Sequence, residues 1–151
     1  MRQLAISLAL LISVTTASAQ QADEPFTRLL SARSVRCDIG RGTQASWDGG
    51  KVQLLNSDFG PGGEVTFDSI DAKAGKARII GNVGAGDVLV LVTIAGLTFV
   101  EQTPLGNVNF TTVFASYDSP SSGRFVAVSS RHQNLNGPFP SQWHGTCSIL
   151  E

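Results

Sequence analysis

The sequence predicts an all-β protein: an antiparallel meander of about nine or ten short strands closed into a small barrel, with one short N-terminal helix. Three observations predict this fold. Short alternating or β-branched apolar runs follow one another from residue 35 onward. Clusters of Gly, Pro, Asn and Asp separate them by turns of mostly two to six residues. No connection is long enough for the crossover that parallel strands need, so the sheet is antiparallel.

The N-terminal residues have the pattern of a secretory signal peptide. Arg2 supplies a positive charge, residues 4–14 form an apolar run, and residues 17–19 read Ala-Ser-Ala, a typical cleavage site. We therefore expect residues 1–19 to be removed and the protein to be secreted or periplasmic. The apolar run is shorter than the roughly 20 residues that a spanning helix needs, and we expect no membrane span.

Residues 20–34 are predicted to form an exposed lead followed by a short helix. Pro25 suits the first position of a helix, where its missing N–H costs nothing. Phe26, Leu29 and Leu30 are spaced to give that helix one apolar face.

Residues 35–151 are predicted to form a single β-domain. Its expected strands cover residues 35–39, 46–55, 64–70, 76–81, 88–94, 97–102, 108–115, 124–131 and 143–149. Asp48-Gly49-Gly50 interrupts the second run and is a strong hairpin signal. The short sequential turns favour a barrel, with a β-sandwich as the alternative.

The run from Val88 to Val92 is apolar at every position, so neither face of this strand suits water. Something must cover its outer side. We expect the N-terminal helix to do so, and another subunit is the alternative.

Cys37 and Cys147 are the only two cysteines and lie near opposite ends of the β-domain. In an oxidising compartment such a pair forms a disulfide, which here would join the first and last strands. The alternative is a catalytic thiol at Cys147, with His144 three residues earlier. A reactive thiol needs an electropositive setting, and an available partner thiol would oxidise it after export.

Composition excludes two classes of protein. Removal of residues 1–19 takes one of eleven basic residues and none of the twelve acidic ones, which leaves a net charge of −2. That charge has the wrong sign for a protein that binds nucleic acid by neutralising phosphates. Charged residues make up only 15% of the chain and apolar residues 42%, which excludes a disordered chain.

Motifs for catalysis are weak in this chain. His132 and His144 are the only histidines, and they would approach each other if the last two strands paired near the turn. With Glu101 or Asp118 they would form a three-ligand zinc site, but their spacing matches no metal-binding motif. There is no G-x-S-x-G nucleophile motif. We predict no catalytic residue, metal or cofactor.

The last two strands hold the most distinctive local sequence. The candidate binding residues here are Arg131, His132, Phe139, Gln142, Trp143 and His144. We expect a non-enzymatic domain that binds a small apolar ligand inside the barrel or a protein partner. Binding of a protein through the Arg131–Trp143 face is one alternative, because arginine and tryptophan dominate interfaces. A histidine-dependent, possible zinc enzyme is the other.

The same region carries a resemblance. Residues 125–132 (Phe-Val-Ala-Val-Ser-Ser-Arg-His), then 140–142 (Pro-Ser-Gln) and 145–147 (Gly-Thr-Cys), resemble the C-terminal tail of small secreted bacterial proteins of unknown function. Residues 97–101 and 111–114 are similar to them as well. The resemblance covers the C-terminal third best. It implies a secreted bacterial setting and no activity.

Overall fold

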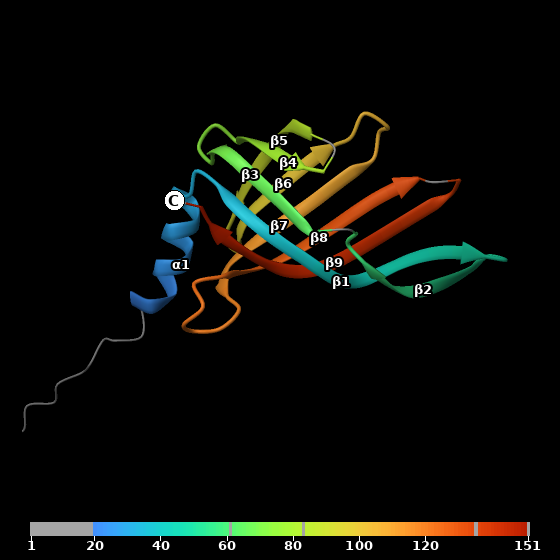
Figure 1. The fold of residues 1–151 in the computed structure, drawn as a ribbon, viewed down its shortest axis with the longest axis horizontal. Helices are drawn as coiled ribbons and strands as arrows, with labels where there is room; N and C mark the ends of the chain where they lie inside the picture. Colours follow the sequence, from blue (N-terminus) through green and yellow to red (C-terminus); the bar gives the residue numbers. More distant parts are fainter. Residues whose placement is uncertain (1–19, 61, 83, 135, 151) are drawn as a thin grey trace, which may run out of the picture.

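The computed structural model describes residues 20–60, 62–82, 84–134 and 136–150, and the predicted signal peptide, residues 1–19, lies outside them. The described chain folds into an antiparallel β-barrel, which confirms the predicted fold class (Figure 1). Its elements are α1 (Gln20–Ser31), β1 (Val35–Asp48), β2 (Lys51–Asp58), β3 (Glu64–Asp71), β4 (Lys76–Gly81), β5 (Gly84–Thr93), β6 (Gly96–Gln102), β7 (Val108–Tyr117), β8 (Phe125–Asn134) and β9 (Pro138–Ile149).

Eight strands close the barrel in the order β1-β3-β4-β5-β6-β7-β8-β9, and β9 pairs back onto β1. β2 is an additional strand that pairs with β1 alone. Consecutive strands from β3 onward are neighbours, as in a meander. The sheet therefore has one pairing between segments far apart in the chain, which is the contact between the first and last strands.

β1 is longer than the sequence predicted. We expected two strands, residues 35–39 and one starting at 46, but a single strand runs through both because a bulge between Ile39 and Gly42 bends it without ending it. Before the bulge β1 pairs with β3, and after it β1 pairs with β2. The β1–β2 hairpin projects beyond the barrel wall (Figure 1). Its turn is the predicted one, with Gly49 and Gly50 at φ 55° and 76°.

Side chains fill the half of the barrel next to α1. Phe67 and Phe99 stack with ring centroids 3.9 Å apart, and Phe125, Leu97 and Val113 are fully buried beside them in the same core. Each such side chain contributes roughly 1.5–3 kcal/mol by its removal from water. This half of the interior is a packed hydrophobic core.

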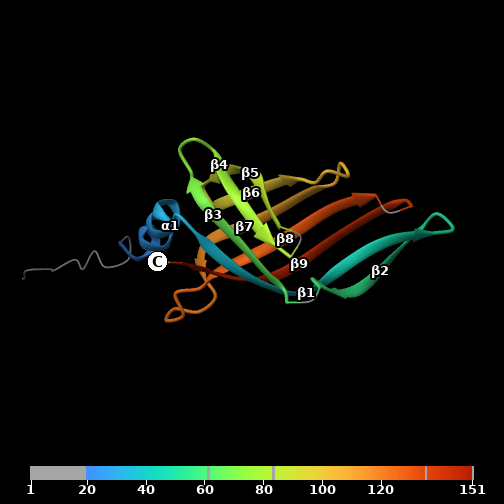
Figure 2. The same cartoon turned by 45° about the horizontal axis from the view of Figure 1, so that its top comes forward.

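The helix α1 closes the filled end of the barrel (Figures 1 and 2). Leu29 is fully buried in the core, and α1 packs against β6 and β7. The helix begins at Gln20, so Pro25 lies inside it, and our expectation that the helix starts at Pro25 was wrong. The fixed φ of proline fits a helix, and near the N-terminus its missing N–H removes only one hydrogen bond. No helix of the described residues is long and apolar enough to cross a membrane.

The outer face of β5 stays uncovered by α1, contrary to our expectation. Leu89 and Leu91 are 59% and 51% exposed. The reason is geometric: α1 lies across the end of the barrel and not along its wall (Figure 2).

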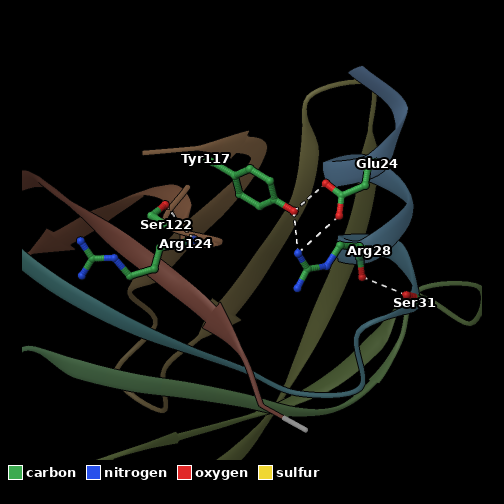
Figure 3. Close-up of polar contacts among 6 residues, drawn as sticks. All are labelled: Glu24, Arg28, Ser31, Tyr117, Ser122 and Arg124. Atoms are coloured by element: carbon green, nitrogen blue, oxygen red, sulfur yellow. Dashed lines mark hydrogen bonds and ion pairs between the residues drawn. The ribbon is translucent and has the colours of Figure 1, made fainter. Parts of the chain in front are cut away.

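A polar cluster fixes α1 to β7 (Figure 3). The Tyr117 hydroxyl donates to Glu24 Oε2 at 2.8 Å and accepts from Arg28 Nη1 at 2.9 Å. Arg28 also pairs with Glu24 at 3.4 Å. Burial, and after it the hydrogen bond to Glu24, raises the pKa of Tyr117, so the phenol stays neutral where it bridges the two charges.

Cys37 and Cys147 form the predicted disulfide. They lie directly opposite each other in the β1–β9 pairing, so the covalent bond and the closing hydrogen-bond ladder coincide.

Replacement of Cys37 by Ser is expected to lower the melting temperature by several degrees or more. The bridge spans 110 residues, and a loop of that size restricts the unfolded chain by about 5 kcal/mol in the chain-entropy model. Differential scanning calorimetry checks this, with reduced wild-type protein as the control. Equal melting of the oxidised wild type and Cys37→Ser would contradict it.

Replacement of Tyr117 by Phe is expected to lower the free energy of unfolding by about 1 kcal/mol, because both hydrogen bonds of its hydroxyl are lost. Urea denaturation measures the change. Ser116→Ala, at the exposed neighbouring position, is the matched control. An unchanged urea midpoint for Tyr117→Phe would show that the cluster does not hold the helix.

Candidate functional site

The end of the barrel away from α1 is hollow. A cavity of about 360 Å³ lies there, lined by residues of β3, β4, β6, β7 and β8 and of the loop that follows β2. We call it the mouth cavity. Glycines explain the space: Ile79 pairs with Gly86 and Gly81 with Gly84, and paired residues face the same side of a sheet. At this level β5 therefore contributes no side chains to the interior.

The lining of the mouth cavity is mixed. Its apolar part is formed by Phe59, Val65 and Ile79. Its polar part includes Glu101, Asn109, Thr111, Ser129, Arg131 and Gln133. A cavity with this lining favours a ligand that has both an apolar body and polar groups.

Arg131 of β8 lies against two aromatic rings that contact each other. Its Cζ lies 4.3 Å from the centroid of the Phe59 ring and 5.0 Å from that of Trp143. The two rings contact each other edge to face at 5.4 Å, and Trp143 is only 5% exposed. These cation–π contacts fix the position of the guanidinium.

The guanidinium of Arg131 makes no hydrogen bond and no ion pair with any described residue. Burial lowers its pKa, and the negative charge of Glu101 acts in the opposite direction. An arginine side chain stays charged in proteins and carries five N–H donors. Arg131 is therefore a partly desolvated cation whose donors the fold does not use.

One carboxylate, that of Glu101, points into the same cavity. Glu101 Oε2 accepts a hydrogen bond from Asn109 Nδ2 at 2.6 Å, and neither oxygen of Glu101 forms an ion pair with Arg131. Glu64 alternates with the inward Val65 and Phe67 on β3, so its carboxylate lies on the outer face, 3.9 Å from Arg36 Nε. The mouth cavity thus presents one guanidinium and one carboxylate.

Polar atoms in the wall around Arg131 are also without partners. Among the described residues, the buried atoms that lack a hydrogen bond are Ser141 Oγ, Trp143 Nε1 and Asn109 Oδ1. Ser141 is the residue opposite Arg131 in the β8–β9 pairing. Buried polar groups are nearly always paired in folded proteins. The wall around Arg131 therefore contains buried hydrogen-bonding groups that no residue of the fold pairs.

The candidate binding residues predicted from the sequence lie on opposite faces of the barrel wall. Arg131 and Trp143 face the interior, and Phe139 is half-buried on the same face, opposite Gln133. His132, Gln142 and His144 occupy the alternate positions and lie on the outer face. Gln142 Nε2 donates there to Ser130 Oγ at 3.1 Å. The six residues therefore do not form one surface.

The two histidines do not approach each other. His132 is opposite Pro140 and His144 is opposite Val128, so they are four residues apart along the hairpin, about 13 Å. No group of three or more potential metal ligands occurs among the described residues. The expected approach of the two imidazoles was wrong, because the register of β8 and β9 offsets them. The alternative of a catalytic thiol at Cys147 is also wrong, since its sulfur is in the disulfide.

Sequence reasoning missed Phe59 and treated Glu101 only as a possible zinc ligand. Phe59 follows β2 in a segment that we expected to be a plain loop, and nothing in the local sequence distinguishes it. Glu101 was detectable: it continues the buried alternation of Leu97 and Phe99 on β6. A carboxylate at an inward position of a strand is itself a signal of a polar interior.

The fold and the cavity define a small β-barrel that is filled at one end and hollow at the other. No protein-family model, no curated protein and no solved structure matches this chain. The resemblance of its C-terminal tail to small secreted bacterial proteins therefore stays a prediction.

Replacement of Arg131 by Met is expected to change the free energy of unfolding by less than about 1 kcal/mol. The two lost cation–π contacts are offset by the lower desolvation cost of an uncharged side chain. Phe67→Ala, in the filled half, is expected to cost about 3–5 kcal/mol. Urea denaturation of both variants checks the contrast. A large loss for Arg131→Met would make Arg131 a structural residue.

Proposed function

We propose that this protein is an exported, non-enzymatic binding protein that holds a small ligand in the mouth cavity. The observation that carries the proposal is Arg131, a cation that lies against Phe59 and Trp143 and whose hydrogen-bond donors no described residue uses. A fold gains nothing from a desolvated, unpaired charge. A ligand that supplies the missing acceptor accounts for it.

The size of the cavity supports this proposal. About 360 Å³ lies within the range of small-molecule sites, roughly 300–1,000 Å³. The packed core beneath it gives the cavity a closed floor. Phe59, Val65 and Ile79 suit the apolar ligand expected from the sequence, and Arg131 adds a polar group to that expectation.

The proposed compartment is the periplasm or the cell exterior. The disulfide between Cys37 and Cys147 supports an oxidising environment. The signal pattern of residues 1–19 supports export. Both agree with a protein that captures its ligand outside the cytoplasm.

A protein partner is the second candidate, and the structure favours a different surface from the Arg131–Trp143 face. Trp47, Val52 and Leu54 of the β1–β2 hairpin are 49%, 54% and 73% exposed. Trp47 and Val52 pair across the hairpin, and Ala45 pairs with Leu54 on the same face. Exposed apolar residues beside an unpaired strand edge are typical of interaction surfaces.

The Gly81→Leu variant tests the proposed function. Gly81 lines the cavity, its φ is not positive, and an added Cβ meets no atom within 4 Å. The leucine is therefore expected to fill the cavity without straining the backbone. Native mass spectrometry of protein purified from its own source is expected to find a bound small molecule on the wild type and none on Gly81→Leu.

Ile80→Leu, on the outer side of the same strand, is the control and is expected to keep the bound molecule. A wild-type protein that carries no small molecule, or a Gly81→Leu variant that carries the same one, would contradict a ligand in the mouth cavity.

A further inference from the structure

We infer that the ligand of the mouth cavity is a small zwitterion of the free α-amino acid class, with a carboxylate, an ammonium group and an apolar side chain. This inference rests on the proposed function and names the chemical class that the same cavity takes. Three features of the lining lead to it.

The first feature is the state of Arg131. Its guanidinium is planar, and the Phe59 and Trp143 rings hold it at 4.3 and 5.0 Å from their centroids. The two ring planes are 85° apart, so the planar guanidinium can lie flat against only one of them, and the N–H donors that point away from both rings are left for other partners. Two parallel N–H donors match the two oxygens of a carboxylate. Arg131 therefore suits an acidic group of the ligand.

The second feature is the charge balance. Arg131 and Glu101, the charged side chains that point into the mouth cavity, give it a formal charge of zero. A ligand with only a carboxylate would gain from Arg131 but be repelled by Glu101. Glu101 has one oxygen, Oε1, with no hydrogen bond to any described residue. An ammonium group on the ligand is the partner that this oxygen and this charge balance favour.

The third feature is the apolar part of the lining. Phe59, Val65 and Ile79 supply surface for a hydrocarbon group, and Gly81 leaves space beside them. A purely ionic ligand would leave this surface in contact with water. An amino acid with an aliphatic side chain uses all three parts of the cavity.

The experiment compares three compounds that share one carbon skeleton. L-Leucine carries both charged groups, 4-methylpentanoate only the carboxylate, and 3-methylbutylamine only the ammonium. Trp47→Phe leaves Trp143 as the single tryptophan, because the chain has two. Trp143 contacts Arg131, so its fluorescence reports occupation of the cavity. In this background L-leucine is expected to bind at least about tenfold more tightly than either analogue, which corresponds to 1.4 kcal/mol.

Two further variants assign the groups. Arg131→Met is expected to weaken L-leucine at least about tenfold and to leave 3-methylbutylamine unchanged or tighter, so retained amine binding shows that the variant is folded. Glu101→Gln is expected to weaken L-leucine and to leave 4-methylpentanoate unchanged or tighter. His132→Ala, on the outer face, is the control and is expected to change none of the three affinities.

Two results would overturn the inference while the proposed function stands. One is equal affinity for L-leucine and 4-methylpentanoate. The other is no binding of any of the three compounds by protein whose native mass spectrum shows a different bound molecule. If none binds and the native spectrum shows an empty protein, the inference and the proposed function fail together.

Discussion

The pairing of β1 with β9 is the constraint on which the rest of the structure depends. It is the one pairing between the two ends of the sheet, and the disulfide lies within it. It also requires glycine: a Cβ on Gly42 would lie 1.9 Å from the Gln142 carbonyl oxygen, and one on Gly145 would lie 2.0 Å from that of Asp38. Because Trp143 pairs with Gly42, the same close approach sets the position of one of the two rings that contact Arg131.

The interior of the barrel has an apolar half and a polar half. The difference comes from the side chains at the inward positions of the strands. Toward α1 these positions hold Phe67, Phe99 and Phe125, which exclude water and supply the stability. Toward the mouth the same strands continue with polar residues, such as Glu101 after Phe99 and Arg131 after Ser129. The rigid half thus acts as a base that holds the polar half in a fixed geometry. Such preorganisation lowers the cost of binding, because few groups have to be ordered when a ligand enters.

The sequence was sufficient for the class of fold, the disulfide and most strands, because alternation and turn residues are local signals. Features that depend on distant segments were not accessible. β1 continues through Gly40 and Gly42 because it pairs with β9, and the local sequence around these glycines does not predict that pairing. The same limit applied to the site. The sequence singled out Arg131 and Trp143. The strand register that places His132 on the outer face, and the contact of Phe59 with Arg131, are properties of the closed barrel.

The position of β9 has a consequence for how the protein is made. This twelve-residue strand is the last element of the described chain, and β1, its partner, is the first strand. During synthesis from the N-terminus, one edge of β1 therefore stays unpaired until all the strands between β1 and β9 have emerged. Contacts of such long sequence separation slow folding. Until β9 is made, the barrel stays open, and a nascent chain truncated before β9 would expose the unpaired edges of β1 and β8 to other proteins.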